Sequence, residues 1–92
     1  MAVRETSTVT LEVAAGLTGT TPARIRRYCQ LGLVRPVRME GDSSWYGPEE
    51  LLRIRKIRRL HEHLGLSLGG IEVILRLTDQ LQELQDRLES LR

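Results

Sequence analysis

The last third of the chain carries a narrow stripe of leucine and isoleucine with the spacing of a coiled coil. Apolar residues recur there at alternating intervals of three and four, with Gln, Glu, Asp and Arg between them. The stripe, called the leucine seam below, consists of Ile74, Leu77, Leu81, Leu84, Leu88 and Leu91. Such a stripe is buried by another helix, and a chain of 92 residues has too small a core to cover it. We therefore expect a helix over 67–92 that pairs with a second copy as a homodimer, and the spacing leaves parallel and antiparallel pairing open.

The composition favours one small, mostly α-helical protein. Hydrophobic residues make up 40% and charged residues 28% of the chain, as in globular domains. Phe is absent and the aromatic residues are Tyr28, Trp45 and Tyr46, which predicts an aliphatic core. The apolar runs are far shorter than the roughly 20 residues of a membrane span, and no signal peptide opens the chain. We expect a cytoplasmic protein with no membrane partner, a first domain over 1–66 and a dimerisation helix over 67–92.

Two short helices with clear start and stop signals precede the seam. Thr10 can cap a helix that runs to Thr18, and Gly19 stops it. The pair Thr21-Pro22 combines an N-cap with a proline at the first helical position. A second helix over 22–30 then ends before Gly32. Two helices joined by Gly-Thr-Thr form a helix-turn-helix.

A β-hairpin and a third helix are expected next. Residues 33–38 are predicted as an extended strand, 40–44 as a turn, and Trp45-Tyr46 as the returning strand of a wing. The third helix opens at 47–50 with Pro and two carboxylates in its first turn. Its apolar stripe should comprise Leu51, Ile54, Ile57, Leu60 and Leu64, with Gly65 ending the helix and Ser67 capping the last one.

Positive charge is concentrated in the middle of the chain. The formal net charge is only +2, but residues 22–63 carry ten basic and five acidic side chains. A basic middle with an acidic segment after it favours a polyanionic partner, above all nucleic acid.

The second helix predicts a surface for contacting DNA. Ile25 and Cys29, one turn apart, should face the core. Arg24, Arg27 and Tyr28 should then lie on the exposed side, with Arg26 at its margin. Guanidinium groups fit guanine edges and phosphates. The alternative is a solvated basic face that pairs with acids such as Glu49 or Glu50.

The chain resembles the MerR family of transcription regulators in several stretches. They read TPARIRRYCQLGLVRP over 21–36, YGPEEL over 46–51, IRKIRRL over 54–60 and LGLSLGGI over 64–71. The resemblance covers about residues 9–92 and is to a short form without an effector domain. It implies a winged helix-turn-helix, an antiparallel coiled-coil dimer, and palindromic promoter DNA that the protein distorts. RNA polymerase is the further partner that it suggests.

The resemblance also implies functional positions. Arg26 matches a family arginine, Arg27-Tyr28 its usual aromatic pair, Arg38 a basic residue entering the wing, and Tyr46 the wing tyrosine. Arg53 and Lys56 match backbone-contacting positions. With Arg24 and Arg27 assigned to base contacts and the others to the DNA backbone, the expected DNA-binding residues are Arg24, Arg26, Arg27, Tyr28, Arg38, Tyr46, Arg53 and Lys56.

Two departures from the family pattern change what is expected of the wing and the second helix. Ser43-Ser44 replace a common Tyr-Arg pair in the wing, which removes or moves a phosphate contact there. Arg27 replaces an aromatic residue, so any base or sugar contact at that position should differ.

Other functions receive less support. His61 and His63 should point to different helix faces and make a poor chelate, so no metal or other cofactor is expected, and Cys29 fits a small core residue. No catalytic set is visible, so an enzyme is not expected. Trp45 should close the wing against the third helix. An exposed Trp45 would favour the alternative, a chaperone modulator similar to CbpM that binds a DnaJ-type co-chaperone. Heat-shock repressors of the HspR type are a third resemblance, with DNA binding retained.

Overall fold

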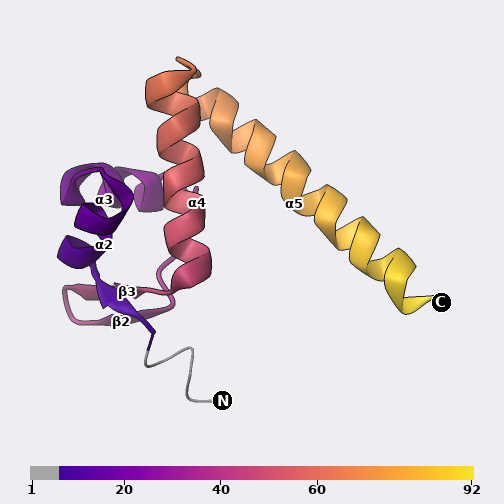
Figure 1. Ribbon diagram of the computed structural model, residues 1–92, viewed down its shortest axis with the longest axis horizontal. Helices are drawn as coiled ribbons and strands as arrows, with labels where there is room; N and C mark the ends of the chain where they lie inside the picture. Colours follow the sequence, from indigo (N-terminus) through magenta and orange to yellow (C-terminus); the bar gives the residue numbers. More distant parts are fainter. Residues whose placement is uncertain (1–6) are drawn as a thin grey trace.

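The computed structural model describes residues 7–92, in which one small antiparallel sheet lies at one end of a helical body and a long helix extends away (Figure 1). Residues 1–6 of the predicted first domain lie outside the described part. In chain order, the elements are β1 (Val9–Thr10), α2 (Leu11–Thr18), α3 (Pro22–Gln30), β2 (Arg38–Glu40), β3 (Ser43–Tyr46), α4 (Pro48–Arg58), the π-helix η1 (Arg59–His63) and α5 (Leu68–Ser90). This arrangement is a winged helix-turn-helix followed by a long helix.

The predicted helix-turn-helix signals are confirmed. The hydroxyl of Thr10 accepts a hydrogen bond from the backbone N–H of Val13, and α2 ends at Gly19, whose φ is 75°. The hydroxyl of Thr21 accepts from the N–H of Arg24 at 3.2 Å, with proline at the start of α3. Gly32, also at φ 75°, lies after the end of α3. Left-handed backbone of this kind favours glycine, so both stops follow from local chemistry.

The wing differs from the predicted hairpin. The strands are β2 and β3, and a third strand, β1, pairs with β3 to give the order β1-β3-β2. The predicted strand over 33–38 is therefore wrong except at Arg38. Leu33 and Val34 are buried in the core instead, and Pro36 has no N–H to donate to a ladder. Val37 alone continues the pairing, by donating its N–H to the carbonyl of Trp45 at 2.9 Å.

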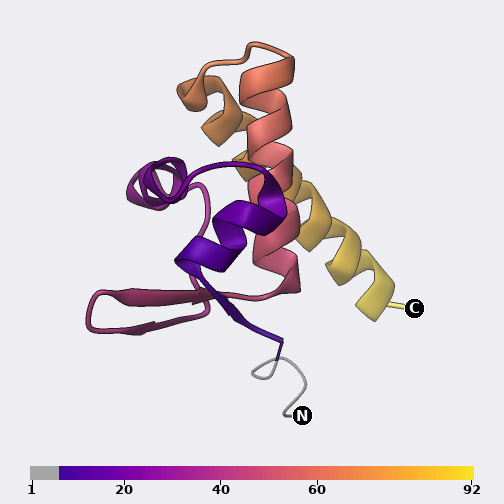
Figure 2. The ribbon, with the colours of Figure 1, turned by 60° about the vertical axis from the view of Figure 1, so that its left-hand side comes forward.

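The core lies where α2, α3, α4 and β3 meet, and the start of α5 completes it (Figure 2). Its largest fully buried side chains are Tyr28, Tyr46, Ile25, Leu33, Ile54, Ile57 and Ile71. The expectation of a purely aliphatic core is thus wrong, because two of the three aromatic residues belong to it.

The third helix changes from an α-helix to a wider π-helix at its C-terminal end. After Arg58 the chain continues as η1, and the N–H of Leu64 donates to the carbonyl of Arg59, five residues earlier, at 3.1 Å. This wider turn rotates Leu64 out of the predicted stripe, so that its side chain is 64% exposed. Gly65 at φ 72° ends the element, and the Ser67 hydroxyl caps α5 by accepting from the N–H of Gly70.

Helix α5 diverges from α4 (Figure 1), and beyond its second turn the ion pair of Asp79 with Arg53 still joins the two helices. Ile71 and Leu75 are buried in the common core, whereas every residue from Arg76 to Arg92 is exposed. We call residues 76–92 the arm and residues 8–66 the head. No helix within residues 7–92 combines the length and the apolar character that crossing a bilayer requires.

Candidate nucleic-acid interface

Helix α3 presents arginines to solvent on the side opposite the core. Arg24, Arg26 and Arg27 are exposed, while Ile25 is completely buried. Within residues 7–92, Arg26 and Arg27 take part in no ion pair. Their guanidinium groups therefore remain open to a partner, as the sequence predicted.

The predicted exposure of Tyr28 is wrong. Its side chain is 1% exposed and belongs to the core beside Ile25, three residues earlier. Cys29, which was expected to face inward as well, is only partly buried. Burial raises the pKa of Tyr28, and the nearby Glu62 carboxylate raises it further. A neutral, enclosed phenol is a packing residue and offers nothing to a phosphate.

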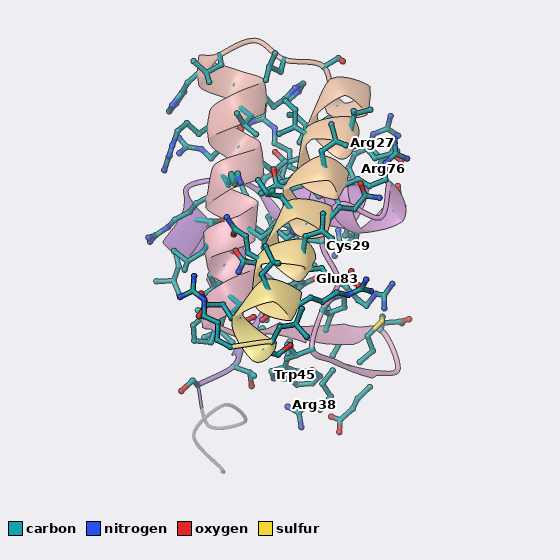
Figure 3. The ribbon with its side chains drawn as sticks, turned by 90° about the vertical axis from the view of Figure 1, so that its right-hand side faces the viewer. Arg27, Cys29, Arg38, Trp45, Arg76 and Glu83 are labelled. Atoms are coloured by element: carbon teal, nitrogen blue, oxygen red, sulfur yellow. The ribbon has the colours of Figure 1, made fainter. Side chains whose placement is uncertain are left out.

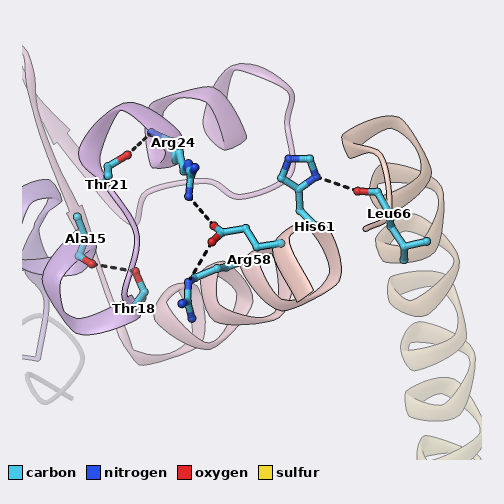
Figure 4. A network of polar contacts seen from close by, with 8 residues as sticks. Ala15, Thr18, Thr21, Arg24, Arg58, His61 and Leu66 are labelled. Atoms are coloured by element: carbon cyan, nitrogen blue, oxygen red, sulfur yellow. Dashed lines mark hydrogen bonds and ion pairs between the residues drawn. The ribbon is translucent and has the colours of Figure 1, made fainter. Parts of the chain in front are cut away.

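Arg24 is held by an acid that the sequence analysis did not select. Its Nη1 lies 2.8 Å from Oε2 of Glu62 in η1, and Nε of Arg58 lies 3.7 Å from the other carboxylate oxygen (Figure 4). The pairing alternative thus applies to Arg24, although with Glu62. Glu50 instead accepts the N–H of Gly47 at 3.0 Å and closes the start of α4. The Arg24 side chain is still 54% exposed.

On the wing, Arg38 lies over the ring of Trp45 (Figure 3). The two residues are cross-strand partners, and the guanidinium carbon is 4.2 Å from the ring centroid, in cation–π contact. Arg38 is also 3.8 Å from a Glu40 oxygen. Side chains alternate along a strand, so Trp45 lies on the sheet face opposite Tyr46. The expectation that Trp45 closes the wing against the third helix is therefore wrong.

Tyr46 is enclosed on the other face of the sheet. Its side chain is 2% exposed, and its hydroxyl lies 3.1 Å from the Ser44 Oγ and 3.5 Å from the Cys29 Sγ. Burial, with a smaller contribution from the Cys29 contact, raises the pKa of Tyr46 to about 12. Like Tyr28, it does not reach the surface where the sequence analysis placed a phosphate contact.

A groove of about 420 Å³ separates α3 from the wing. Arg26 lines its α3 side, and Arg35 lines it from the segment that follows α3, with Asp42 at the turn of the wing. Arg35 is exposed and has no ion pair within the described residues 7–92. Sequence reasoning missed it because 33–38 was interpreted as a strand. The available signal was its position directly after two apolar residues that enter the core.

Helix α4 carries Arg53 and Lys56, which were both predicted to contact the DNA backbone but have different surroundings. Lys56 is exposed. Arg53 is instead engaged within the protein: its Nε donates to the carbonyl of Leu33, and its two terminal nitrogens each lie 3.1 Å from an oxygen of Asp79 in α5. A contact of Arg53 with DNA stays a prediction, and the contacts that the structure shows for it join α4 to α5.

The comparison with known families fits this geometry. The model of the "MerR HTH family regulatory protein" family matches residues 9–92. The chain belongs to the MerR family. A protein of Streptomyces coelicolor that bears the name heat shock protein HspR is 36% identical to it over 83 residues, which are 90% of this chain and 55% of that relative. This MerR-family chain thus spans about half the length of the relative. Its family places it among DNA-binding transcription regulators, which are not usually enzymes.

Of the two histidines of this MerR-family chain, His61 makes a structural contact and His63 is exposed. His61 Nδ1 lies 2.8 Å from the carbonyl oxygen of Leu66, where it bridges η1 and the loop before α5 (Figure 4). In the part of the chain that the structure describes, no group of three or more His, Cys, Asp or Glu side chains is arranged to hold a metal ion.

Proposed function

We propose that this MerR-family chain binds palindromic promoter DNA sequence-specifically as a homodimer and regulates transcription there, with RNA polymerase as a further partner at the promoter. One observation carries the proposal: α3 is fixed by Ile25 and Tyr28 in the core and presents to solvent Arg26 and Arg27, which form no ion pair within residues 7–92. A rigid helix with free guanidinium groups suits the major groove.

The exposed basic side chains are assigned to two kinds of contact with DNA. Arg27, in the middle of the exposed side of α3, is assigned to base edges, with Arg24 beside it and anchored by Glu62. Arg26 and Arg35 line the groove between α3 and the wing, which suits a phosphate of the backbone, and Arg38 and Lys56 add charge from the wing and α4. Tyr28 and Tyr46 leave the list, because their side chains are buried. Arg53 is given no DNA contact in this proposal, because its guanidinium group is paired with Asp79.

The leucine seam supports the homodimer. Leu77, Leu81, Leu84, Leu88 and Leu91 are each between 55% and 81% exposed in the single chain. Apolar side chains in this pattern are stabilised by a second helix. A twofold dimer would present two α3 helices to two half-sites, which corresponds to an inverted repeat in the DNA.

The first experiment is selection of bound sequences from fragmented promoter DNA, followed by a salt titration on the enriched sequence. The proposal predicts an inverted repeat and an affinity that falls steeply with salt. Weak binding without enrichment would contradict it, and the partly buried Trp45 of the wing would then be tested against a DnaJ-type co-chaperone.

Substitutions separate the two kinds of contact. Arg27→Ala should cost about 1–3 kcal/mol on the selected site and relax the base preference at one position. Arg26→Ala and Arg35→Ala should each lower the salt slope by roughly one and weaken binding to all sequences alike. Arg92→Ala at the end of the arm is the matched control, with the same loss of charge and no expected effect. An unchanged affinity for R27A would remove Arg27 from the interface.

A further inference from the structure

Helix α5 has a second face besides the leucine seam. Ile71, Leu75 and Asp79 recur at intervals of four and therefore lie along one side of the helix. The first two are buried in the core of the head, and the third accepts the ion pair from Arg53. The face that docks α5 on the head thus ends in a charged contact.

The Arg53 side chain joins three parts of the molecule. From α4, its Nε donates to the carbonyl of Leu33, one residue beyond the glycine that follows α3, and its terminal nitrogens bind both oxygens of Asp79 at 3.1 Å. It is held in place, with 30% of its side chain exposed. A bidentate guanidinium–carboxylate pair fixes direction as well as distance. The guanidinium group of Arg53 therefore fixes both the backbone that follows α3 and the direction of α5.

Past Asp79 every residue is exposed, and within the described residues none of them belongs to the core, although Gln80 and Glu83 still line a groove with Leu31 and Arg53. The buried contacts before it are apolar and non-directional. A helix rises about 1.5 Å per residue, so a swing of about 10° at Asp79 moves the end of α5 by about 3 Å. One base pair advances a half-site by about 3.4 Å. The displacement of the end of α5 by a change of about 10° at Asp79 is thus comparable with the length of one base pair between the half-sites.

We propose that the contact of Arg53 with Leu33 and Asp79 positions α5 on the head and thereby sets the distance between the two α3 helices of the dimer. Through that distance, it selects the spacing of the DNA half-sites. Arg53 is in this view a positioning residue that need not touch DNA. The inference rests on the proposed homodimeric DNA-binding function.

The direct test measures the distance between heads without DNA. A spin label on Gln30→Cys in a Cys29→Ser background gives one head-to-head distance per dimer by double electron–electron resonance. Asp79→Asn should broaden or shift that distribution, and Arg53→Lys, which loses the planar fork, should do the same. Asp86→Asn is the matched control, because it makes the same change at an exposed position of α5 whose carboxylate accepts a hydrogen bond from Gln82 of the same helix at 3.0 Å. Its distribution should equal that of the unsubstituted protein.

The second readout is preference for operator spacing. On the selected palindrome with spacers of minus one, zero and plus one base pair, the parent protein and D86N should prefer one spacing. For D79N the ratio between best and worst spacer should fall at least threefold. An equal loss of affinity on all spacers, or an unchanged distance distribution in a folded D79N dimer, would overturn the inference alone. If the parent protein itself gave no distance between protomers, the homodimer would fail first and this inference with it.

Discussion

Two leucines only two residues apart in α5 show how differently the head and the arm are built. Leu75 is 2% exposed and belongs to the core of the head, whereas Leu77, half a turn further on, is 57% exposed. The residue type and the helix are the same, and only the neighbours differ. Burying apolar surface stabilises by roughly 25 cal/mol per Å², and the arm leaves that stabilisation unused within one chain. The head and the first two turns of α5 bury a common core, whereas the arm leaves its apolar seam exposed within one chain.

The largest expected effect comes from substitutions that prevent the arm from pairing with a second arm. Leu81→Asp with Leu84→Asp places charges in the seam and should abolish the homodimer entirely in sedimentation, while the head keeps its helical signal. Gln82→Asp with Gln85→Asp introduces the same charges beside the seam and should leave the dimer intact. A double L81D/L84D variant that still sediments as a dimer would show that the seam is not the interface.

Truncation of single apolar residues should separate the two regions next. In the monomeric L81D/L84D background, Ile54→Ala in the core should lower the free energy of unfolding by about 2–5 kcal/mol, because Ile54 is completely buried. Leu88→Ala in the arm should change it by less than about 0.5 kcal/mol. Denaturant titration measures both. Similar losses at the two positions would mean that the arm folds back on the head in solution.

The pH dependence of the free energy of unfolding at alkaline pH tests the burial of Tyr46 in the head. The pKa of Tyr46 is raised from 10.0 to about 12 in the folded head. Above pH 10 the unfolded chain loses this proton first, so the stability is full below pH 10 and falls as the pH rises towards 12, by on the order of 2 kcal/mol. Tyr46→Phe should flatten that part of the unfolding profile while Tyr28 retains its own contribution. A Y46F profile as steep as that of the parent would contradict the burial of this phenol.

The smallest expected effects come from removing one ion pair in each region, Arg24–Glu62 in the head and Arg87–Glu83 in the arm. Glu62→Gln frees Arg24 from its carboxylate, and an exposed pair of this kind is worth about 0.2–1 kcal/mol. DNA binding should therefore tighten by up to about fivefold, since Arg24 no longer has to exchange one anion for another. Glu83→Gln releases Arg87 in the arm and should leave the affinity unchanged in a fluorescence anisotropy titration. Weaker binding by E62Q would instead show that Glu62 holds Arg24 in its productive position.

The sequence predicted the helical scaffold because its signals are local. Thr10, Thr21 and Ser67 cap helices with their own hydroxyls, and Gly19 and Gly32 stop them by left-handed backbone. The exposed arginines of α3 were predicted for the same reason, since the period of a helix fixes which residues share a face. The strand β1 and the π-turn η1 were not predicted, because two paired residues and one widened turn leave no periodic signal.

The amino-acid sequence alone therefore determined the helix boundaries, the apolar seam and the family to which the chain belongs, all of which depend on residue types at fixed spacings. Only the tertiary structure decided which polar side chains are available. Tyr28 and Tyr46 lie in the core, Arg53 binds Asp79, and Arg35 opens onto the groove beside α3. Amphipathic side chains can serve equally well inside or outside. Their roles are settled by neighbours far apart in the sequence, which local patterns do not encode.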